Sequence, residues 1–302
     1  MSDAQYRAQV ALLVRILPLL AGEPDFALKG GTAINLFWRD LPRLSVDLDL
    51  TYLPLADRPT SLAAIEAGLR RLADRIRAQI AGAAVDLQGG AEGVHRILVR
   101  VGGIQVKVEV TPVLRGVVFA PEVRAVTRRV EDAFGFAEVN LVSFADLFAG
   151  KMVAALDRQH PRDLFDVRDL LATEGLTRPL IEAFLIYLVS HNRPMAEVLA
   201  PNRKDIAEEF ERTFAGMTEA PVDIAELVRA REDLIGGVHA ALTEADRRFL
   251  LGVKLGEPDW GLVGLPDAAA LPAVQWKLAN LGRLEAARRQ ALAAARPPVA
   301  PG

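Results

Sequence analysis

Two aspartates separated by one residue are the feature of this sequence most suited to chemistry. Asp47 and Asp49 fall in residues 45–52, where apolar and polar residues alternate as they do in a β-strand. The two carboxylates therefore share one face of the strand, where they repel each other and lose hydration if the face is covered. A bound cation relieves that repulsion. A site made of carboxylate oxygens suits Mg²⁺, which keeps waters and substrate phosphates as its other ligands.

A pair of glycines precedes these aspartates. Gly30 and Gly31 carry no Cβ, so a bulky anion can approach the backbone there. Residues 32–38 then read as a short helix, and the free N–H groups at a helix N-terminus favour phosphate. An Asp-x-Asp pattern alone is more often a solvated strand face than a metal site. The glycine turn adds an anion-binding feature beside it, and together the two predict a site for a nucleoside triphosphate with its metal.

A candidate third carboxylate comes from a later strand. Residues 104–111 alternate cleanly, which places Lys107 and Glu109 on one face and a row of valines on the other. Glu109 is therefore a candidate third ligand for a metal held by Asp47 and Asp49. The alternative is that Lys107 and Glu109 belong to a solvated strand face, and the sequence alone does not separate these two interpretations.

A lysine on an apolar helix face marks a second region. Ser143 reads as an N-cap with Asp146 in the position of a capping box, and the helix that follows carries Lys151 near the centre of its apolar arc. A lysine on a buried face needs an anionic partner or must lose its charge. One interpretation is that its stem reaches past the core to water. The functional interpretation is a phosphate-binding lysine.

The next helix offers anionic partners for this lysine. Pro161 ends one helix and can open the next. In residues 162–172 Asp163 lies within the apolar arc and Asp166 beside it, whereas Asp169 faces away and is expected to be solvated. An aspartate near Lys151 could simply pair with it and hold it in position, which is a structural role with a functional consequence.

The other elements divide the chain into two parts. Alternating runs predict further strands at residues 84–88, 94–101 and near 136–141, with the rest of residues 113–140 unassigned. Helical periodicity is found at residues 3–20, 61–80, 178–190, 204–215, 222–236, 243–252 and 271–296, with a loop at 257–270. We therefore expect an α+β chain. A domain with a small mixed sheet and flanking helices spans residues 1–174, and an all-helical domain spans residues 175–302.

Composition excludes some classes of protein. The 302 residues are 51% hydrophobic and 25% charged, as in ordinary globular proteins. The absence of cysteine excludes disulfides, thiolate metal sites and cysteine nucleophiles, and it fits a reducing cytosol. No apolar run is long enough for a membrane span, and residues 5–20 read as an amphipathic helix and not as a signal peptide. A cytoplasmic location is expected.

The net charge of −3 argues against a protein that coats nucleic acid by bulk charge alone. A local basic patch remains open in the last expected helix, where one acid, Glu285, accompanies Lys277, Arg283, Arg288, Arg289 and Arg296. Such a cluster is either a solvated helix face or a surface that binds a phosphate backbone.

Two motifs together resemble a known family. LKGGTAINLF…RLSVDLDL, followed much later by DLFAGKMVAALDRQHPRDLFDV, resembles the AbiEii/AbiGii family. This family comprises nucleotidyltransferase-like toxins of bacterial abortive-infection and toxin–antitoxin systems, includes the mycobacterial MenT enzymes, and belongs to the DNA polymerase β-like nucleotidyltransferase superfamily. The likeness is strong over about residues 26–172 and weaker beyond, where PAVQWKLANL resembles a family segment. The resemblance therefore implies a polymerase β-like nucleotidyltransferase domain in the N-terminal part.

The resemblance implies roles for residues of the first motif. Asp47 and Asp49 would bind the metal. The nucleotide would be held by the glycine turn and nearby polar side chains, namely Gly30, Gly31, Thr32 and Ser45, with Arg43 in support. One departure concerns the third metal carboxylate that the superfamily carries on a later strand, for which the best fit here is a glutamate, Glu109.

The second motif supplies the remaining roles implied by the resemblance. Lys151 would be the essential lysine near the triphosphate, and Asp166 would correspond to the family's later catalytic acid. Arg162 and Asp163 would form the adjoining Arg-Asp pair that supports them. Asp166 would orient either Lys151 or the acceptor.

The implied function is a Mg²⁺-dependent nucleotidyltransferase that acts as the toxin of a toxin–antitoxin or abortive-infection system. It would transfer a nucleoside monophosphate from a nucleoside triphosphate to RNA, with the 3′ end of tRNA as the expected acceptor and a cognate antitoxin as the expected partner. Two alternatives stay open. The acceptor could be a protein or a small molecule, or the chain could be a catalytically weak protein that binds nucleotide or RNA. The preferred nucleotide and the oligomeric state do not follow from the sequence.

Overall fold

The computed structural model describes residues 3–90 and 93–283, and within it the chain packs as two compact units. The first comprises Met1–Ser143 with Thr218–Ala220, and the second comprises Phe144–Met217 with Pro221–Gly302. The sequence predicted a division at residues 174–175, where strands cease. Packing divides the chain earlier because α5 (Phe144–Arg158) and α6 (Pro161–Thr173) pack with other helices of the second unit.

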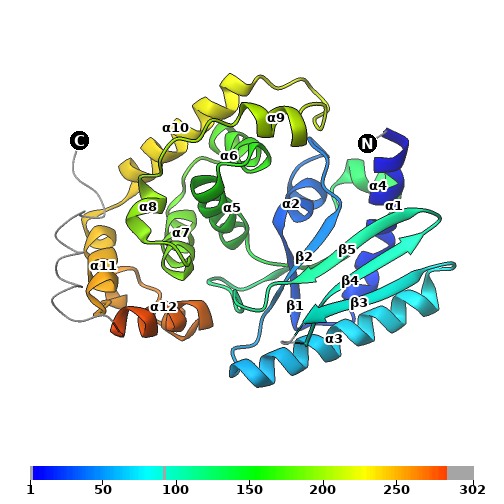
Figure 1. Ribbon diagram of the computed structural model, residues 1–302, viewed down its shortest axis with the longest axis horizontal. Coiled ribbons are helices and arrows are strands. Elements are labelled where there is room, and N and C mark those ends of the chain that lie inside the picture. Colours follow the sequence, from blue (N-terminus) through cyan, green and yellow to red (C-terminus); the bar gives the residue numbers. More distant parts are fainter. Residues whose placement is uncertain (1–2, 91–92, 284–302) are drawn as a thin grey trace. The chain divides into compact units, whose positions relative to one another are not determined.

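A mixed sheet forms the centre of the first unit (Figure 1). In its described residues seven strands follow the order β3-β4-β5-β2-β1-β7-β6, with parallel pairs at β2·β5 and β1·β7. The strands are β1 (Phe26–Lys29), β2 (Asp47–Tyr52), β3 (Ala84–Gly90), β4 (Gly93–Val101), β5 (Ile104–Val110), β6 (Glu122–Ala125) and β7 (Glu138–Leu141). Leu48 and Leu50 are fully buried, so the aspartates between them occupy the opposite face of β2, as the alternation predicted.

The strand β1 was missed by the sequence analysis, although it lies between β2 and β7 in the sheet. Its three apolar residues, Phe26, Ala27 and Leu28, are all buried, so the strand shows a continuous apolar run with no alternation. A run this short does not distinguish a strand from a loop. The strand β6 and the helix α4 (Arg128–Phe134) occupy the segment that the sequence left unassigned.

Helices of the first unit pack on one another and on strands of the sheet. They are α1 (Asp3–Leu20), α2 (Gly30–Ala33), the π-helical turn η1 (Ile34–Trp38) and α3 (Arg58–Gln79), together with α4. The helix predicted at residues 32–38 is therefore a short α-helix that continues as a π-helix. Glu23 is buried after α1 and accepts hydrogen bonds from Arg71 at 2.6 Å and Arg75 at 2.7 Å, which fixes the start of the sheet against α3.

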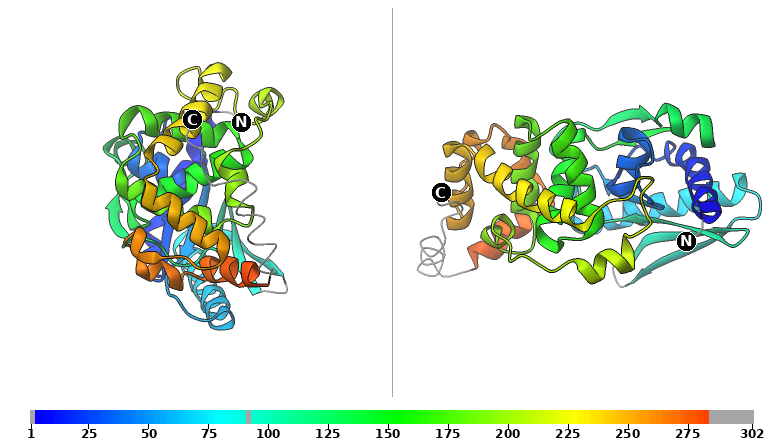
Figure 2. Two further views of the ribbon diagram at one scale, coloured as in Figure 1. Left: turned by 90° about the vertical axis from the view of Figure 1, so that its left-hand side faces the viewer. Right: turned by 90° about the horizontal axis from the view of Figure 1, so that it is seen from above.

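The second unit contains only helices among its described residues (Figures 1 and 2). Besides α5 and α6 they are α7 (Arg178–Ser190), α8 (Met195–Leu199), α9 (Ala207–Thr213), α10 (Ile224–Ala241), α11 (Glu244–Leu255), η2 (Trp260–Leu262), η3 (Pro266–Ala270) and α12 (Pro272–Gly282). The expected loop at 257–270 thus contains two 3₁₀ turns, and α8 was not predicted. The hydroxyl of Tyr187 donates to the buried Asp146 at 3.1 Å, which attaches α7 to the start of α5.

The last expected helix is only partly within the described residues. Glu285, Arg288, Arg289 and Arg296 lie outside them, and α12 ends at Gly282. Lys277 is buried and donates to the backbone carbonyls of His191 at 2.8 Å and Arg193 at 2.7 Å. Placing Lys277 in a solvated basic cluster was therefore wrong, because this lysine satisfies carbonyls after the end of α7. In the described part of the chain no helix is both long and apolar enough to span a membrane.

Candidate functional site

The glycine turn lies directly against residues of the Asp-x-Asp strand and of the loop before it. Gly30 has a φ of +78°, and a Cβ there would lie 2.5 Å from Oδ2 of Asp49. A Cβ on Gly31 would lie 2.6 Å from a guanidinium nitrogen of Arg43 and 2.9 Å from Oγ of Ser45. A side chain at either glycine would have to displace these groups. The turn is therefore glycine because polar side chains occupy the space that a Cβ would take.

Hydroxyl groups connect the turn to the loop that precedes β2. Oγ1 of the buried Thr32 and Oγ of Ser45 lie 3.1 Å apart, and Arg43 is buried with its Nη1 donating to the carbonyl of Leu44 at 3.0 Å. The first unit thus brings together four of the residues that the sequence predicted for nucleotide binding, Gly30, Gly31, Thr32 and Ser45, whereas Lys151 belongs to the second unit. These four residues form one cluster with Asp49 at the C-terminal end of β1.

The parallel pairing of β2 with β5 aligns acidic and basic side chains across the two strands. Asp47 is in register with Lys107, and Asp49 with Glu109. Nζ of Lys107 lies 3.4 Å from Asp47 and 3.0 Å from Glu109, and Arg96 on β4 contacts Glu109 at 2.7 Å. The side chains of Lys107 and Glu109 are 30% and 26% exposed. They therefore form a paired charge cluster and not a fully solvated strand face.

The charges of this cluster stabilise one another. Burial alone would raise the pKa of Glu109, but hydrogen bonds and charges from Arg96 and Lys107 hold that pKa below its ordinary value. Burial alone would lower the pKa of Lys107, but the hydrogen bond that it donates to Glu109 and the charge of Asp47 raise that pKa. Among the described residues no three acidic or histidine side chains group closely enough to hold an ion together. The role of Glu109 as a third metal ligand therefore stays a prediction.

The structure also places Lys29 in this region, a residue to which the sequence analysis gave no role. It ends β1 in register with Asp49 on the neighbouring strand. Burial lowers the pKa of Lys29, and the charge of Asp49 opposes that change. Lys29 directly precedes the glycine pair, and this position could have indicated its role. The position becomes informative only once residues 26–29 are recognised as a strand.

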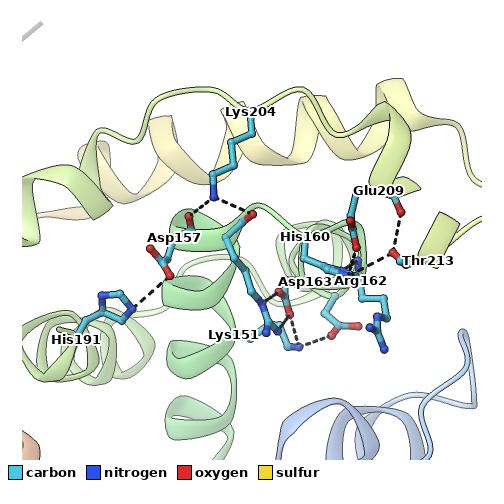
Figure 3. A network of polar contacts seen from close by, with 11 residues as sticks. Lys151, Asp157, His160, Arg162, Asp163, His191, Lys204, Glu209 and Thr213 are labelled. Carbon is cyan, nitrogen blue, oxygen red and sulfur yellow. Dashed lines mark hydrogen bonds and ion pairs between the residues drawn. The ribbon is translucent and has the colours of Figure 1, made fainter. Parts of the chain in front are cut away.

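The second unit holds the other predicted residues in a buried ionic cluster. Nζ of Lys151 lies 2.8 Å from Asp163 and 3.0 Å from Asp166, with side-chain exposures of 9% for the lysine and 1% for each aspartate. Figure 3 shows Lys151 extending from α5 toward Asp163 on α6. The prediction that an aspartate pairs with Lys151 is confirmed. The alternative, in which its stem reaches water, is wrong.

A second cation shares this cluster. Arg158 lies two helical turns after Lys151 and therefore on the same side of α5. It donates to both carboxylate oxygens of Asp163, with Nη2 at 2.9 Å from Oδ1. Burial would raise the pKa of Asp163, but Lys151 and Arg158 hold it well below its usual value. Asp163 is thus an ionised carboxylate that carries two cations. The sequence analysis did not assign Arg158 a role, although its spacing from Lys151 was a usable signal.

The junction between α5 and α6 fixes the orientation of this cluster. His160 caps α6, since its Nδ1 accepts the backbone N–H of Arg162, and its Nε2 lies 3.2 Å from Glu209 (Figure 3). Gln159 has a φ of +54°, and its side-chain amide donates to the carbonyl of Asn202 at 2.8 Å. The side chain of Arg162 is exposed, so the contact made by its backbone N–H, and not its guanidinium, contributes to this junction.

Comparison with known proteins identifies the family and the fold of the chain. Residues 11–280 match the family model described as "Nucleotidyl transferase AbiEii toxin, Type IV TA system". Among solved structures the chain is similar to MenT4, a nucleotidyltransferase toxin from Mycobacterium tuberculosis H37Rv, with a TM-score of 0.62 and 17% identity over 92% of this chain and 95% of that chain. At that identity the likeness shows the fold. A search of curated proteins gave no match. The predicted α+β nucleotidyltransferase-like fold is confirmed.

Proposed function

The chain belongs to the AbiEii family of nucleotidyltransferase toxins of type IV toxin–antitoxin systems, and from this premise we propose that it transfers a nucleoside monophosphate from a nucleoside triphosphate to an RNA acceptor. The observation that carries this proposal is the close approach of the glycine turn to Asp49 and Ser45. That arrangement places backbone suited to an anion beside carboxylates suited to a cation, which is what a nucleotide with its metal requires.

We propose that Asp47 and Asp49 hold Mg²⁺, with Glu109 as a weaker third ligand. All three are carboxylates on one face of adjacent strands, and oxygen ligands are those that Mg²⁺ prefers. When bound, the metal would stabilise negative charge on the oxygens of an in-line phosphoryl displacement. The protein would contribute by holding the carboxylates in fixed positions, and the register of β2 with β5 sets those positions.

The phosphates of the nucleotide are assigned to the glycine turn and the hydroxyls beside it. Gly30 and Gly31 leave the backbone open, and Thr32 and Ser45 offer hydroxyl groups that already lie 3.1 Å apart. The family likeness assigns Lys151 to neutralise charge on the departing pyrophosphate. Asp163 and Asp166 would hold its ammonium group in place, so their role in catalysis is to position Lys151.

The acceptor and the partner are part of the same proposal. The 3′ end of tRNA is the acceptor that the family resemblance favours, and transfer to it would block aminoacylation. A cognate antitoxin would restrain this activity in the cytoplasm, where nucleoside triphosphates and tRNA occur together. These assignments rest on the likeness of motifs, since a fold alone does not determine a substrate.

The test is incubation of the purified chain with total bacterial RNA, Mg²⁺ and each labelled nucleoside triphosphate in turn. Asp47→Ala is the inactive control, because it removes a proposed metal ligand whose side chain is 48% exposed and not part of the core. We expect label in a band of tRNA size with the wild-type chain and none with the variant.

Other outcomes discriminate between the alternatives. Label on protein or on a small molecule, and not on RNA, would overturn the RNA acceptor and retain nucleotidyl transfer. Binding of nucleotide with no transfer to any acceptor would favour a binding protein. Equal labelling by the wild type and Asp47→Ala would overturn the assignment of Asp47.

A further inference from the structure

A lysine lies between two of the carboxylates proposed to hold the metal. Lys107 is on β5, and its Nζ is 3.4 Å from the carboxylate of Asp47 on β2 and 3.0 Å from that of Glu109 on its own strand. The ammonium group therefore bridges two strands through the acids that a metal would also use. A divalent cation bound by both carboxylates would compete with Lys107 for the same oxygens.

The surrounding charges show why this competition matters. A row across four strands places Lys29 opposite Asp49, Asp49 beside Glu109, and Glu109 opposite Arg96. With Asp47 and Lys107 added, this row and its two neighbours comprise three acids and three cations. Their formal charges cancel, whereas a divalent cation binds most tightly where negative charge is in excess.

Lys107 differs from the other two cations of the face in how readily it can leave. Lys29 is partly buried at the end of β1, where burial lowers its pKa. Arg96 lies on β4, in register with Glu109, and contacts that carboxylate at 2.7 Å. The side chain of Lys107 is 30% exposed on a flexible stem, so its ammonium can turn to water when its carboxylates are taken by another cation.

We propose that Lys107 is an internal counter-cation of the metal site, which a divalent ion displaces from Asp47 and Glu109 as it binds. Lys107 neutralises the carboxylates in the metal-free protein and lowers the affinity of the site for the ion. It is a positioning residue and not a ligand. The inference rests on the proposed assignment of Asp47 and Asp49 to metal binding, and it adds a residue that sets how tightly the metal is held.

The test is a titration of Mn²⁺ alone, without nucleotide, into the wild type and Lys107→Met, with free Mn²⁺ followed by electron paramagnetic resonance. We expect Lys107→Met to bind Mn²⁺ about tenfold more tightly, because one positive charge within contact of the carboxylates is removed. Lys107→Arg keeps the charge and should bind as the wild type does. Lys107→Gln repeats the neutralisation with a polar side chain, in case the methionine variant does not fold.

Arg100→Met is the matched control, because it removes an equal charge from the same sheet. Arg100 pairs with Asp86 and Gln105 and has no place in the proposed site. Its Mn²⁺ affinity should stay within about twofold of the wild type, since a more distant surface charge is screened by salt. An equal gain in Arg100→Met and Lys107→Met would show a general charge effect and would overturn the specific role of Lys107.

Asp49→Asn separates failure of the inference from failure of the proposed metal site. Loss of Mn²⁺ binding in Asp49→Asn, with unchanged or weaker binding in both neutral Lys107 variants, would overturn the inference alone. Undiminished Mn²⁺ binding in Asp49→Asn, or no binding by the wild type and by both neutral Lys107 variants, would remove the metal site itself and the inference with it.

Discussion

Predicted functional side chains are partly exposed on the sheet of the first unit and buried in the helical second unit. On the sheet, Asp47 has a side chain that is 48% exposed and a cation 3.4 Å away. In the helical unit, Asp163 and Asp166 are 1% exposed and share the ammonium of Lys151. The sheet thus offers in Asp47 a carboxylate that a ligand can reach, whereas the helices hold a lysine that contacts two buried carboxylates. Under the proposed function, the carboxylates of the sheet would bind the metal, whereas Asp163 and Asp166 would position Lys151.

This difference predicts which substitutions should reduce stability and which should reduce activity alone. A buried ion pair that loses one partner leaves an uncompensated charge in the core, so substitutions in the helical cluster should reduce both stability and activity. An exposed carboxylate that loses its charge costs the fold little, so substitutions on the sheet should reduce activity alone.

The largest expected effect on stability is that of Asp163→Asn. It removes the carboxylate that pairs with Lys151 and Arg158, and the buried lysine loses the nearer of its two carboxylate contacts. We expect the free energy of unfolding to fall by about 3–5 kcal/mol, measured by urea denaturation. Asp169→Asn on the same helix is the control, because its pair with Arg168 is partly exposed and should contribute about 1 kcal/mol or less. Similar losses in both variants would contradict the account.

The same carboxylate predicts a dependence of stability on pH. The pKa of Asp163 is lower in the folded chain than its ordinary value near 4, so its contribution to stability is complete above about pH 4 and is lost as the pH falls toward the folded value. The difference in unfolding free energy between the wild type and Asp163→Asn should therefore narrow by on the order of 2 kcal/mol as the pH is lowered from 7 toward 2. A constant difference over that range would show that Asp163 is not a stabilising anion.

Gly30→Ala should reduce activity more than stability. The new Cβ would meet Asp49 at 2.5 Å and must displace its carboxylate, which should lower the rate of nucleotidyl transfer about 100-fold. The positive φ should cost about 1–2 kcal/mol in unfolding free energy. Gly82→Ala is matched, since Gly82 has a φ of +74° with nothing within 4 Å of its added Cβ. It should lose similar stability and keep its activity, and equal activity in the two variants would contradict a role for the turn.

The smallest expected effect is that of Ser45→Ala. It removes one hydroxyl from the contact with Thr32, which should cost about 1 kcal/mol, seen as about a fivefold rise in KM for the nucleoside triphosphate. Combined with Thr32→Val, the effects should be less than additive because the two hydroxyls share one contact. Additive effects would indicate that each hydroxyl acts independently.

How far the sequence predicted the structure differs between the two units. The periodicity of α5 and α6 placed Lys151 and Asp163 on apolar faces, and the rule that a buried charge needs a partner then predicted their pairing. On the sheet, alternation located β2 and β5 and the faces of their aspartate and glutamate side chains. Alternation could not give the neighbour of each strand or their register, which depend on contacts between distant segments.

The missing tertiary information explains why one lysine was overlooked and why two others were given incomplete or wrong surroundings. Lys29 gained meaning only when β1 was found beside β2, and Lys107 only when parallel register set it opposite Asp47. Lys277 was assigned to solvent because its helix is basic, yet it reaches carbonyls of a distant loop. These features arise from tertiary contacts and leave little local signal in the chain.

The most direct test of the account compares Asp49→Asn with the wild type in nucleotidyl transfer and in thermal unfolding. The account predicts a loss of transfer on the order of a thousandfold, because the carboxylate proposed to hold the metal is neutralised, with a smaller fall in melting temperature than Asp163→Asn causes. Retained transfer in a folded Asp49→Asn protein would contradict the assignment of chemistry to the sheet.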